Sequence, residues 1–390
     1  MTKLDELLQK HCPNGVSKKK ISDVLFSIHS GLNPRQNFKL NTGGSFYYVT
    51  VKEITTGKIV FSDKTDKIDL DAWKKIQSRS HLETGDVLLS GIGTIGKVAV
   101  VDIDTTNWNC SESVLLLKPN PSLITSWYLK YVLESKEIQD HFNGTAVGST
   151  LKGIRIKDLE ELEISVPPLE VQCEIVRILD SFTELTAELT AELTARKKQY
   201  EYYRDNLLNF DKFEGGAIRY VKLSEILKIK NGSDYKHLSS GNIPVYGSGG
   251  IMTYVDRPAF SKPSVLIPRK GSIDKLYYVD TPFWNVDTVF YTDVDTRYAV
   301  VKYIYYCLQK EHLEKLNKAG GVPSLTQHQL NNVVIPLPSL DVQSRIVYLL
   351  DTFDAICSDL KDGLPAEITA RKTQYAYYRD KLLTFKEFTA

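Results

Sequence analysis

The chain has 390 residues, of which 42% are hydrophobic and 25% charged, and its formal net charge is +1. This composition is ordinary for a soluble protein of two or three domains. We find no run of 18 apolar residues and no leader-like start, so we expect a cytoplasmic protein with no membrane partner. The five scattered cysteines support neither a disulfide framework nor a zinc site.

The first long region, residues 18–166, mixes short apolar runs with turn residues and one helix-like stretch at 127–142. Within it, GIGTIGK at 91–97 fits two phosphate-binding patterns, G-x-G-x-x-G and G-x-x-x-x-G-K. Both patterns require a helix next, whose N-terminus holds the phosphate. Strand-like KVAVV follows instead, and Val98 stands where Ser or Thr would be needed. We therefore predict a hairpin turn at 91–97 and no nucleotide site.

A helix comes next, and then the whole order repeats. Residues 175–207 carry apolar side chains at spacings of three and four, which predicts one amphipathic helix, and the tetrapeptide TAEL occurs in it twice. Residues 219–337 then repeat the mixed pattern of the first region, with PSVLIPRKGSIDKLYYV aligning to GDVLLSGIGTIGKVAVV. A second apolar stripe follows up to Leu382, interrupted by Gly363 and by Pro365, which suits a helix restart.

The duplication is strongest in the helices. LEVQCEIVRILDSF returns as LDVQSRIVYLLDTF with 8 of 14 positions identical, and TARKKQYEYYRDNLLNF returns as TARKTQYAYYRDKLLTF with 13 of 17 identical. We predict an α+β fold in which two duplicated mixed α/β domains are joined by two long helices that form an antiparallel coiled coil. The expected boundaries are 1–166 for the first domain, 167–210 for the central helical spacer, 211–337 for the second domain and 338–390 for the distal spacer.

Glycine-marked hairpin tips in both domains carry cations, which suggests a nucleic-acid interface. Lysine can contact phosphate at such tips, and arginine can read guanine edges. Two further loops, marked by Gly or Pro, carry polar side chains suited to base edges. The alternative is that each tip is only a solvated turn. The candidate DNA-binding residues are Arg35, Lys97, Tyr246, Ser248, Arg269, Lys270 and Lys275.

Residues for catalysis are not recognisable in the chain. The tetrapeptide VPPL at 166–169 differs from the motif with which amino-methyltransferases hold an exocyclic amine, and FEGG at 213–216 lacks the spacing of an adenosylmethionine loop. The histidines form no H-E-x-x-H pair, and we predict no metal site. The chain is expected to be a binding protein and not an enzyme.

The two variable regions, each closed by a VPPLExQ-like segment and a helix ending in RKxQYxYYRDxLLxF, resemble the specificity subunit of type I restriction–modification systems. The TAEL repeat is similar to the spacer of one class of these subunits, although CSDLKDGLPAEI replaces it in the distal helix. The resemblance implies that each domain recognises one half of a bipartite, asymmetric double-stranded DNA target. It also implies that the paired helices set the distance between the halves.

The resemblance further implies partners for these helices. Two modification subunits would dock on them and bring adenosylmethionine, and restriction subunits would bring ATP, Mg²⁺ and cleavage, so the chain itself would hold no cofactor. The candidate docking residues are Leu185, Leu189, Leu193, Tyr200, Tyr203, Leu360, Tyr375 and Tyr378. Two other hypotheses remain at this stage, namely a coiled-coil scaffold with duplicated modules and no DNA role, and a methyltransferase in its own right.

Overall fold

The computed structural model describes residues 2–35, 37–55, 57–145, 153–210, 218–317, 321–356 and 363–388. The chain forms two compact units. Unit 1 comprises Met1–Leu189 and Glu367–Ala390, and unit 2 comprises Thr190–Ala366. Each unit therefore contains one of the two predicted domains together with helical segments. In the described part of the chain, no helix is both long and apolar enough to cross a membrane.

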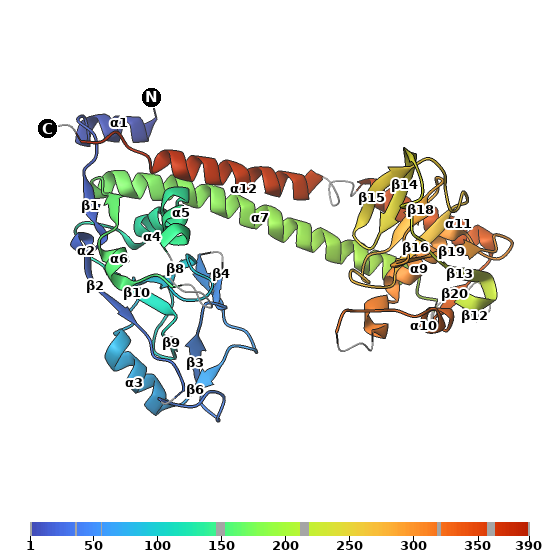
Figure 1. The fold of residues 1–390 in the computed structure, drawn as a ribbon, viewed down its shortest axis with the longest axis horizontal. Coiled ribbons are helices and arrows are strands. Elements are labelled where there is room, and N and C mark those ends of the chain that lie inside the picture. Colours follow the sequence, from blue (N-terminus) through green and yellow to red (C-terminus); the bar gives the residue numbers. More distant parts are fainter. Residues whose placement is uncertain are drawn as a thin grey trace. The chain divides into compact units, whose positions relative to one another are not determined.

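Unit 1 is a mixed α/β body in which strands precede and follow the helices (Figure 1). The helix-like stretch predicted at 127–142 is two helices, because Ser135 ends the first of them in an extended conformation. The elements of unit 1 in chain order are α1 Lys3–His11, β1 Lys18–Lys20, α2 Ile21–Val24, β2 Leu25–Ser30, β3 Phe46–Val49, β4 Ile54–Thr55, β5 Lys58–Ile59, β6 Lys67–Ile68, α3 Leu70–Ser80, β7 Val87–Ser90, β8 Val98–Val100, β9 Trp108–Cys110, β10 Val114–Pro119, α4 Ser126–Glu134, α5 Lys136–Thr145, α6 Ile156–Glu160, β11 Glu163–Ser165, the first half of α7 Leu169–Leu207, and all but the first turn of α12 Gly363–Leu382.

Unit 2 repeats this order with fewer elements. It begins with the second half of α7 and continues through β12 Arg219–Lys222, α8 Leu223–Ile226, β13 Leu227–Asn231, β14 Ser240–Gly247, β15 Gly250–Val255, β16 Ser264–Pro268, β17 Tyr277–Val279, β18 Trp284–Asn285, β19 Val289–Val294, α9 Val301–Lys310, the 3₁₀ helix η1 Leu313–Leu316, α10 Gln327–Asn331, β20 Val334–Leu337 and α11 Leu340–Ile356.

Strand order confirms the predicted duplication. The sheet β2-β10-β7-β8 of unit 1 corresponds to β13-β19-β16-β17 of unit 2, and the pair β1-β11 corresponds to β12-β20. The three-stranded sheets β6-β3-β9 and β15-β14-β18 also match, and in each of them the last two strands pair in parallel. Unit 1 alone adds the small hairpin β4-β5 and, after β6, the helix α3.

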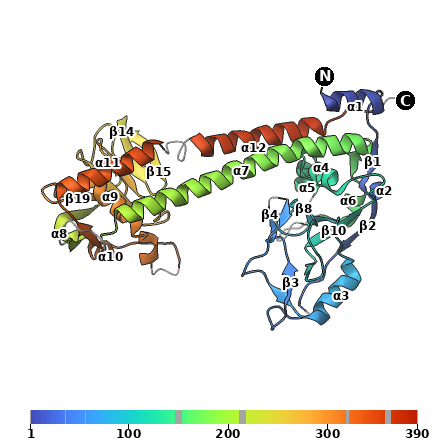
Figure 2. The same ribbon diagram turned by 180° about the vertical axis from the view of Figure 1, so that it is seen from behind.

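Each unit packs its own pair of helices by the same aromatic contact. In unit 1, α12 runs beside the first half of α7 (Figure 2), and Phe182 stacks on Tyr378 with ring centroids 5.5 Å apart. In unit 2, Phe353 of α11 stacks on Tyr203 of α7 at 5.2 Å. The distal stripe is two helices, since α11 ends at Ile356 and α12 begins at Gly363, which leaves Pro365 in a first turn where its missing N–H is tolerated.

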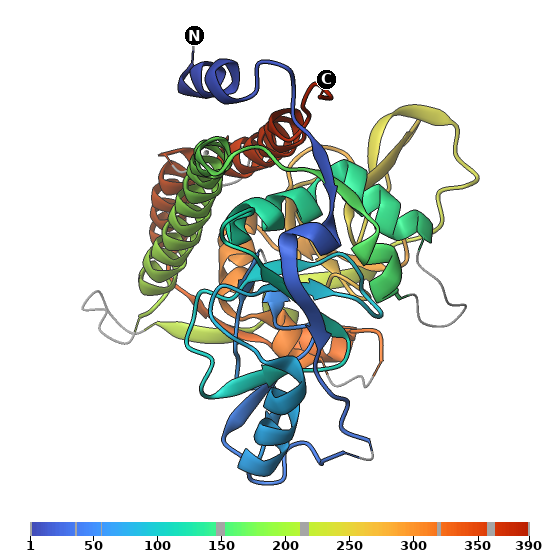
Figure 3. The ribbon, with the colours of Figure 1, turned by 90° about the vertical axis from the view of Figure 1, so that its left-hand side faces the viewer.

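The residues before β1 and those after α12 meet in unit 1, on the side that Figure 3 turns toward the viewer. The backbone N–H of Val16 donates to the carbonyl of Lys386 at 2.9 Å, and Val16 forms a parallel bridge with Glu387. Leu383 and Phe385 also pack against the core cluster of unit 1. In unit 2 the corresponding side chains Leu208 and Phe210 are part of the core itself.

Candidate nucleic-acid interface

The glycine-marked segment of unit 1 is the hairpin turn that the sequence predicts. Residues 91–97 connect the antiparallel strands β7 and β8, and Gly93 and Gly96 both adopt a φ of +85°. The ammonium group of Lys97 donates to the carbonyl of Val51 at 2.9 Å. The cation at the tip of unit 1 is therefore already hydrogen-bonded to the loop that contains Val51. A shallow hollow of about 350 Å³ lies here, lined by Thr50, Val51, Lys52, Thr94, Lys97 and Ser113.

The equivalent tip of unit 2 presents its cations differently. The backbone of Arg269 is anchored on both sides, because its N–H donates to Thr288 and its carbonyl accepts from Leu325. The guanidinium carbon of Arg269 lies 4.9 Å from the centre of the Phe290 ring, and the buried Nε has no hydrogen-bond partner there. Lys270 and Lys275 are exposed. Of the three predicted cations, the two lysines are exposed and Arg269 is half-buried.

The structure brings the second predicted loop of unit 2 beside this tip. A Cβ atom placed on Gly271 would lie 3.6 Å from the hydroxyl oxygen of Ser248. The hydroxyl of Tyr277 donates to the carbonyl of Ser248 at 3.1 Å, and the rings of Tyr246 and Tyr277 are 5.8 Å apart. Burial raises the pKa of the Tyr246 hydroxyl, which is therefore a neutral group at physiological pH. Four predicted residues, Tyr246, Ser248, Lys270 and Lys275, consequently belong to one region.

Arg35 of unit 1 lies on a separate turn between β2 and β3, and its side chain is exposed. Next to it, the amide of Asn33 donates to a carboxylate oxygen of Glu112 at 2.5 Å. This contact holds the turn against the loop between β9 and β10.

A buried glutamine joins the helices to the domain in each unit. In unit 1, Gln172 of α7 accepts the backbone N–H of Thr125 at 2.9 Å and donates to the carbonyls of Leu123 and Pro167, both at 2.8 Å. In unit 2, Gln343 of α11 accepts the N–H of Val300 at 2.8 Å and donates to the carbonyls of Tyr298, at 3.0 Å, and Pro338, at 2.8 Å. Both glutamines are fully buried. The two units therefore share one helix attachment, built from three hydrogen bonds.

A tyrosine–aspartate pair repeats as well. The hydroxyl of Tyr131 donates to Asp180 of α7 in unit 1, and the hydroxyl of Tyr306 donates to Asp351 of α11 in unit 2 at 2.5 Å. Burial is the largest cause that raises the pKa of both phenols, followed by the hydrogen bond to the carboxylate. Both tyrosines stay protonated and remain donors over the whole physiological pH range.

The candidate docking residues on the helices separate into groups. Tyr200 and Tyr375 are partly buried within their own units, and burial raises the pKa of both. Tyr203 and Tyr378 form the stacked pairs described above. Leu185 is 36% exposed, Leu189 and Leu193 are half-buried, and Leu360 lies outside the described residues.

Two tyrosines that the sequence analysis did not select are more exposed than any of these. Tyr202 on α7 is 65% exposed, and Tyr377 on α12 is 60% exposed. They occupy the same position of the duplicated YYRD motif, one in each unit. The repeated tyrosine pair is visible in the sequence. Which tyrosine of the pair points to solvent depends on the neighbours against which its helix packs, and the sequence does not show this.

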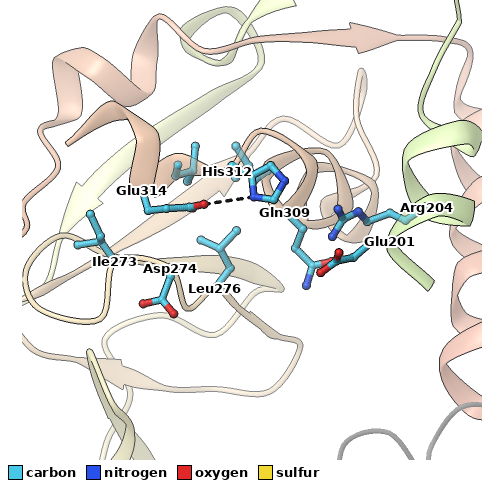
Figure 4. A pocket seen from close by; sticks show the side chains of 10 residues that line it. Glu201, Arg204, Ile273, Asp274, Leu276, Gln309, His312 and Glu314 are labelled. Atoms are coloured by element: carbon cyan, nitrogen blue, oxygen red, sulfur yellow. Dashed lines mark hydrogen bonds and ion pairs between the residues drawn. The ribbon is translucent and has the colours of Figure 1, made fainter. Parts of the chain in front are cut away.

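A cavity of about 270 Å³ in unit 2 lies beside the same motif (Figure 4). Arg204, which is 6% exposed, lines it and donates from Nε to the carboxylate of Asp205 at 2.8 Å. His312 contacts Glu314 across it at 3.2 Å. In unit 1, Gln139, which aligns in sequence with Glu314, donates its amide to the carbonyls of Gly96 and Leu133. The cavity is lined by Glu201, Arg204, Ile273, Asp274, Leu276, Leu308, Gln309, His312, Leu313 and Glu314.

The ten described residues that line this cavity include carboxylates, one arginine and one histidine. None of these ten is a Ser, Thr or Cys, whose hydroxyl or thiol groups are common nucleophiles. Across the described ranges, no group of three His, Cys, Asp or Glu side chains is placed to hold a metal ion.

Comparison with known proteins places the chain among DNA specificity proteins. The family model "Type I restriction modification DNA specificity domain" matches residues 13–196 and again 218–370. The chain is 34% identical over 260 residues to a type I restriction enzyme specificity subunit of Haemophilus influenzae, a match that covers 58% of this chain and 65% of that one. It is 36% identical over 247 residues to the EcoR124I/EcoR124II specificity subunit of Escherichia coli, covering 56% and 60%.

These matches span less than two thirds of the length of either relative. A solved structure, that of a type I restriction–modification S subunit from M. genitalium, covers 95% of this chain and 96% of its own with a TM-score of 0.56. At 22% identity, this likeness concerns the fold.

Proposed function

The chain belongs to the family defined by the type I restriction–modification DNA specificity domain, and from this premise we propose that it is the subunit that selects the DNA sequence for such a complex. The observation that carries the proposal is the duplication itself. The same helix attachment occurs twice, beneath two sets of tips that differ in sequence and in structure.

In this proposal each unit recognises one half of a bipartite, asymmetric double-stranded DNA target. Exposed Lys270 and Lys275 contact phosphates, while Tyr246, Ser248 and their surroundings face base edges. Lys97 and Arg35 contribute from unit 1. A net charge of +1 is compatible with this role, because the charge that matters is local and because partner subunits can share the phosphate contacts.

Two modification subunits dock on the helices in this proposal, one at each copy of the duplicated motif. An exposed tyrosine is a common centre of a protein interface, since it combines a large apolar ring with a hydroxyl. Tyr202 and Tyr377 are the exposed tyrosines at equivalent positions, so identical partners would meet the same side chain in both units. Adenosylmethionine, ATP and Mg²⁺ would be bound by the modification and restriction subunits. The family match disfavours both a scaffold without a DNA role and a self-sufficient methyltransferase.

Methylation mapping tests this function. Cells that express the modification subunit of the same system should methylate adenines in a bipartite asymmetric target only when this chain is also present. The purified chain alone should show no methylation, ATPase or nuclease activity. Methylation at an unchanged target in the absence of the chain, or turnover by the chain after removal of all partner subunits, would contradict the proposal.

The length of α7 gives a second test, since this helix belongs to both units. Deleting Thr190–Leu193 removes one TAEL tetrapeptide, roughly 6 Å of helix and about 400° of rotation, which leaves the apolar stripe some 40° out of phase. At about 3.4 Å per base pair, this length corresponds to one to two base pairs if it lies wholly along the DNA. Because the helix need not lie parallel to the DNA, we expect the spacer between the half-sites to shorten by one base pair, with both half-sites unchanged. Deleting only two residues rotates the stripe by about 200° and should abolish assembly. An unaltered spacer in the four-residue deletion would refute the proposed ruler.

A further inference from the structure

The hairpin β14–β15 of unit 2 exposes three large apolar side chains, all of them on β15. Ile251 is 50% exposed, Met252 58% and Tyr254 50%. The strands are irregular here, because Val245 pairs with Thr253 and Tyr246 with Ile251, so Met252 is an extra residue in a bulge. A Cβ on Gly247 would lie only 2.4 Å from the sulfur of Met252, so the glycine makes room for that side chain. Strand β18 pairs with β14 at Val245 and Tyr246, so β15 is the edge strand of this three-stranded sheet, and the turn of the hairpin, Gly247–Gly250, extends beyond the third strand as a two-stranded ribbon.

The matching sheet of unit 1 is covered. There Ile68 of β6 pairs with β3 and is 1% exposed, because α3 packs over it with Ala72 and Ile76. Asn109 of β9 and Asn285 of β18, each of which follows a tryptophan, pair with Tyr48 and Tyr246 and so align the two sheets. Two residues earlier, β3 pairs with Ile68 and β14 pairs with Tyr254, so Tyr254 is the counterpart of Ile68. No helix follows β15, and residues 256–263 lead directly to β16. The segment that buries this face in unit 1 is therefore absent from unit 2.

Cations gather around this ribbon. From Tyr246 to Leu276 the chain has five Lys or Arg residues and two Asp, a net charge of 5 − 2 = +3, whereas the whole chain has +1. Lys270 and Lys275 are exposed on the tip that touches the turn of the ribbon at Ser248. An apolar ribbon beside a cationic tip suits a polyanion that also offers apolar groups. Double-stranded DNA is such a ligand, and its major groove is wide enough for a two-stranded β-ribbon.

We propose that the β14–β15 ribbon enters the major groove of the half-site bound by unit 2 and that Ile251 and Met252 contact thymine methyl groups. The proposal rests on the function proposed above and identifies a specificity-determining element within it. The thymine methyl is the apolar group that base edges present in the major groove, so an aliphatic side chain distinguishes a T·A pair by this contact. Unit 1 lacks a bare ribbon at this position, so it recognises its half-site by other elements.

Methylation mapping with the double variant Ile251→Ala, Met252→Ala tests this assignment in the complete complex. We expect relaxed specificity at one or two positions of one half-site, each of them a T·A pair in the wild-type target. The other half-site and the spacer should be unchanged. The matched control is Tyr220→Ala, Val334→Ala, which removes two exposed apolar side chains from the β12–β20 sheet of the same unit and should leave the target unaltered. All four side chains are exposed, so neither variant should disturb folding.

A binding measurement separates the methyl contact from other effects. Deoxyuracil in place of thymine at a relaxed position removes only the methyl group. It should weaken binding of the wild-type complex about fourfold, the equivalent of one buried methyl group, and leave the double variant unaffected. Relaxation at G·C pairs, an unchanged target in the double variant, or lost assembly with the modification subunit would overturn the proposal. The last outcome would mark the ribbon as a protein interface. Absence of any bipartite methylation in the wild type would instead refute the proposed function.

Discussion

Units 1 and 2 are alike where they hold their helices and different where they face outward. Gln172 and Gln343 make the same three hydrogen bonds, and the tyrosine–aspartate pairs and stacked rings repeat as well. Between their matching strands, however, unit 1 inserts β4, β5 and α3, and unit 2 has a tight turn and the bare ribbon β14–β15.

The difference shows which parts of the chain share a task. The helix attachment is made by the same atoms in both units, so it performs the same task in each of them, which is to hold a helix against its domain. Segments that differ between the copies face different requirements, as expected if the two units bind unlike half-sites. Substitutions in the helix attachment, in the tips and at Glu174 test how far the two units are equivalent.

The largest effect should come from the buried glutamines. Gln172→Ala leaves one backbone N–H and two carbonyls of unit 1 without partners, and Gln343→Ala does the same in unit 2. Each substitution should lower the free energy of unfolding by roughly 3 kcal/mol, because each buried unpaired group costs about 1–3 kcal/mol. Urea denaturation measures the loss, and hydrogen exchange assigns it to a unit. Exposed Gln199→Ala is the control. If only one of the two substitutions lowered the stability of its unit strongly, the two helix attachments would not be equivalent.

A smaller effect should distinguish the two tips in DNA binding. Lys270→Ala with Lys275→Ala removes two exposed cations, whereas Lys97→Ala removes one whose ammonium already bonds to Val51. The slope of the logarithm of the binding constant against the logarithm of the salt concentration should become shallower in both variants. The double variant should lose the equivalent of about two phosphate contacts, and Lys97→Ala the equivalent of less than one. Gel-shift titrations of the assembled complex between 50 and ~200 mM salt measure these slopes. Lys315→Ala, on η1, controls for loss of charge alone. Equal slopes for all three variants would leave the tips as solvated turns.

The smallest effect concerns an ion pair that unit 1 has and unit 2 lacks. Hydrogen bonding to Arg177, with help from Lys3, lowers the pKa of buried Glu174 to about 2 from its usual 4.5. Because the folded-state pKa is the lower one, the stabilisation is complete above pH 4.5 and is lost as the pH falls toward 2. The position corresponds to Arg345 in unit 2.

Glu174→Gln should therefore destabilise the attachment of α1 by about 1 kcal/mol at pH 7 and flatten its acid dependence. Hydrogen exchange of α1 between pH 7 and pH 3 provides the measurement, with exposed Glu184→Gln as the control. The α11 helix should respond equally in variant and wild type. A variant whose α1 keeps the wild-type acid profile would remove Glu174 from this role.

The duplicated fold was predictable because identical residues recur in the same order, and the turn at Gly91–Lys97 because a strand follows it. The directions of the tyrosines were not. YEYYRD places Tyr200, Tyr202 and Tyr203 within about one helical turn, so the sequence cannot say which of them faces the domain, the partner helix or solvent. The bare ribbon was equally hidden, since the absence of a covering helix becomes visible only when β15 is compared with β6.

The buried glutamines have one more consequence, which concerns the alignment of helix and domain. An apolar stripe is nearly degenerate, because moving a helix along its axis by one turn brings similar side chains back to similar places. The carboxamide of Gln172 is not degenerate, since it meets one N–H and two carbonyls at fixed points. A shift by one residue turns it about 100° away from all three. A single side chain in each unit thus selects one alignment among those that the hydrophobic contacts would accept.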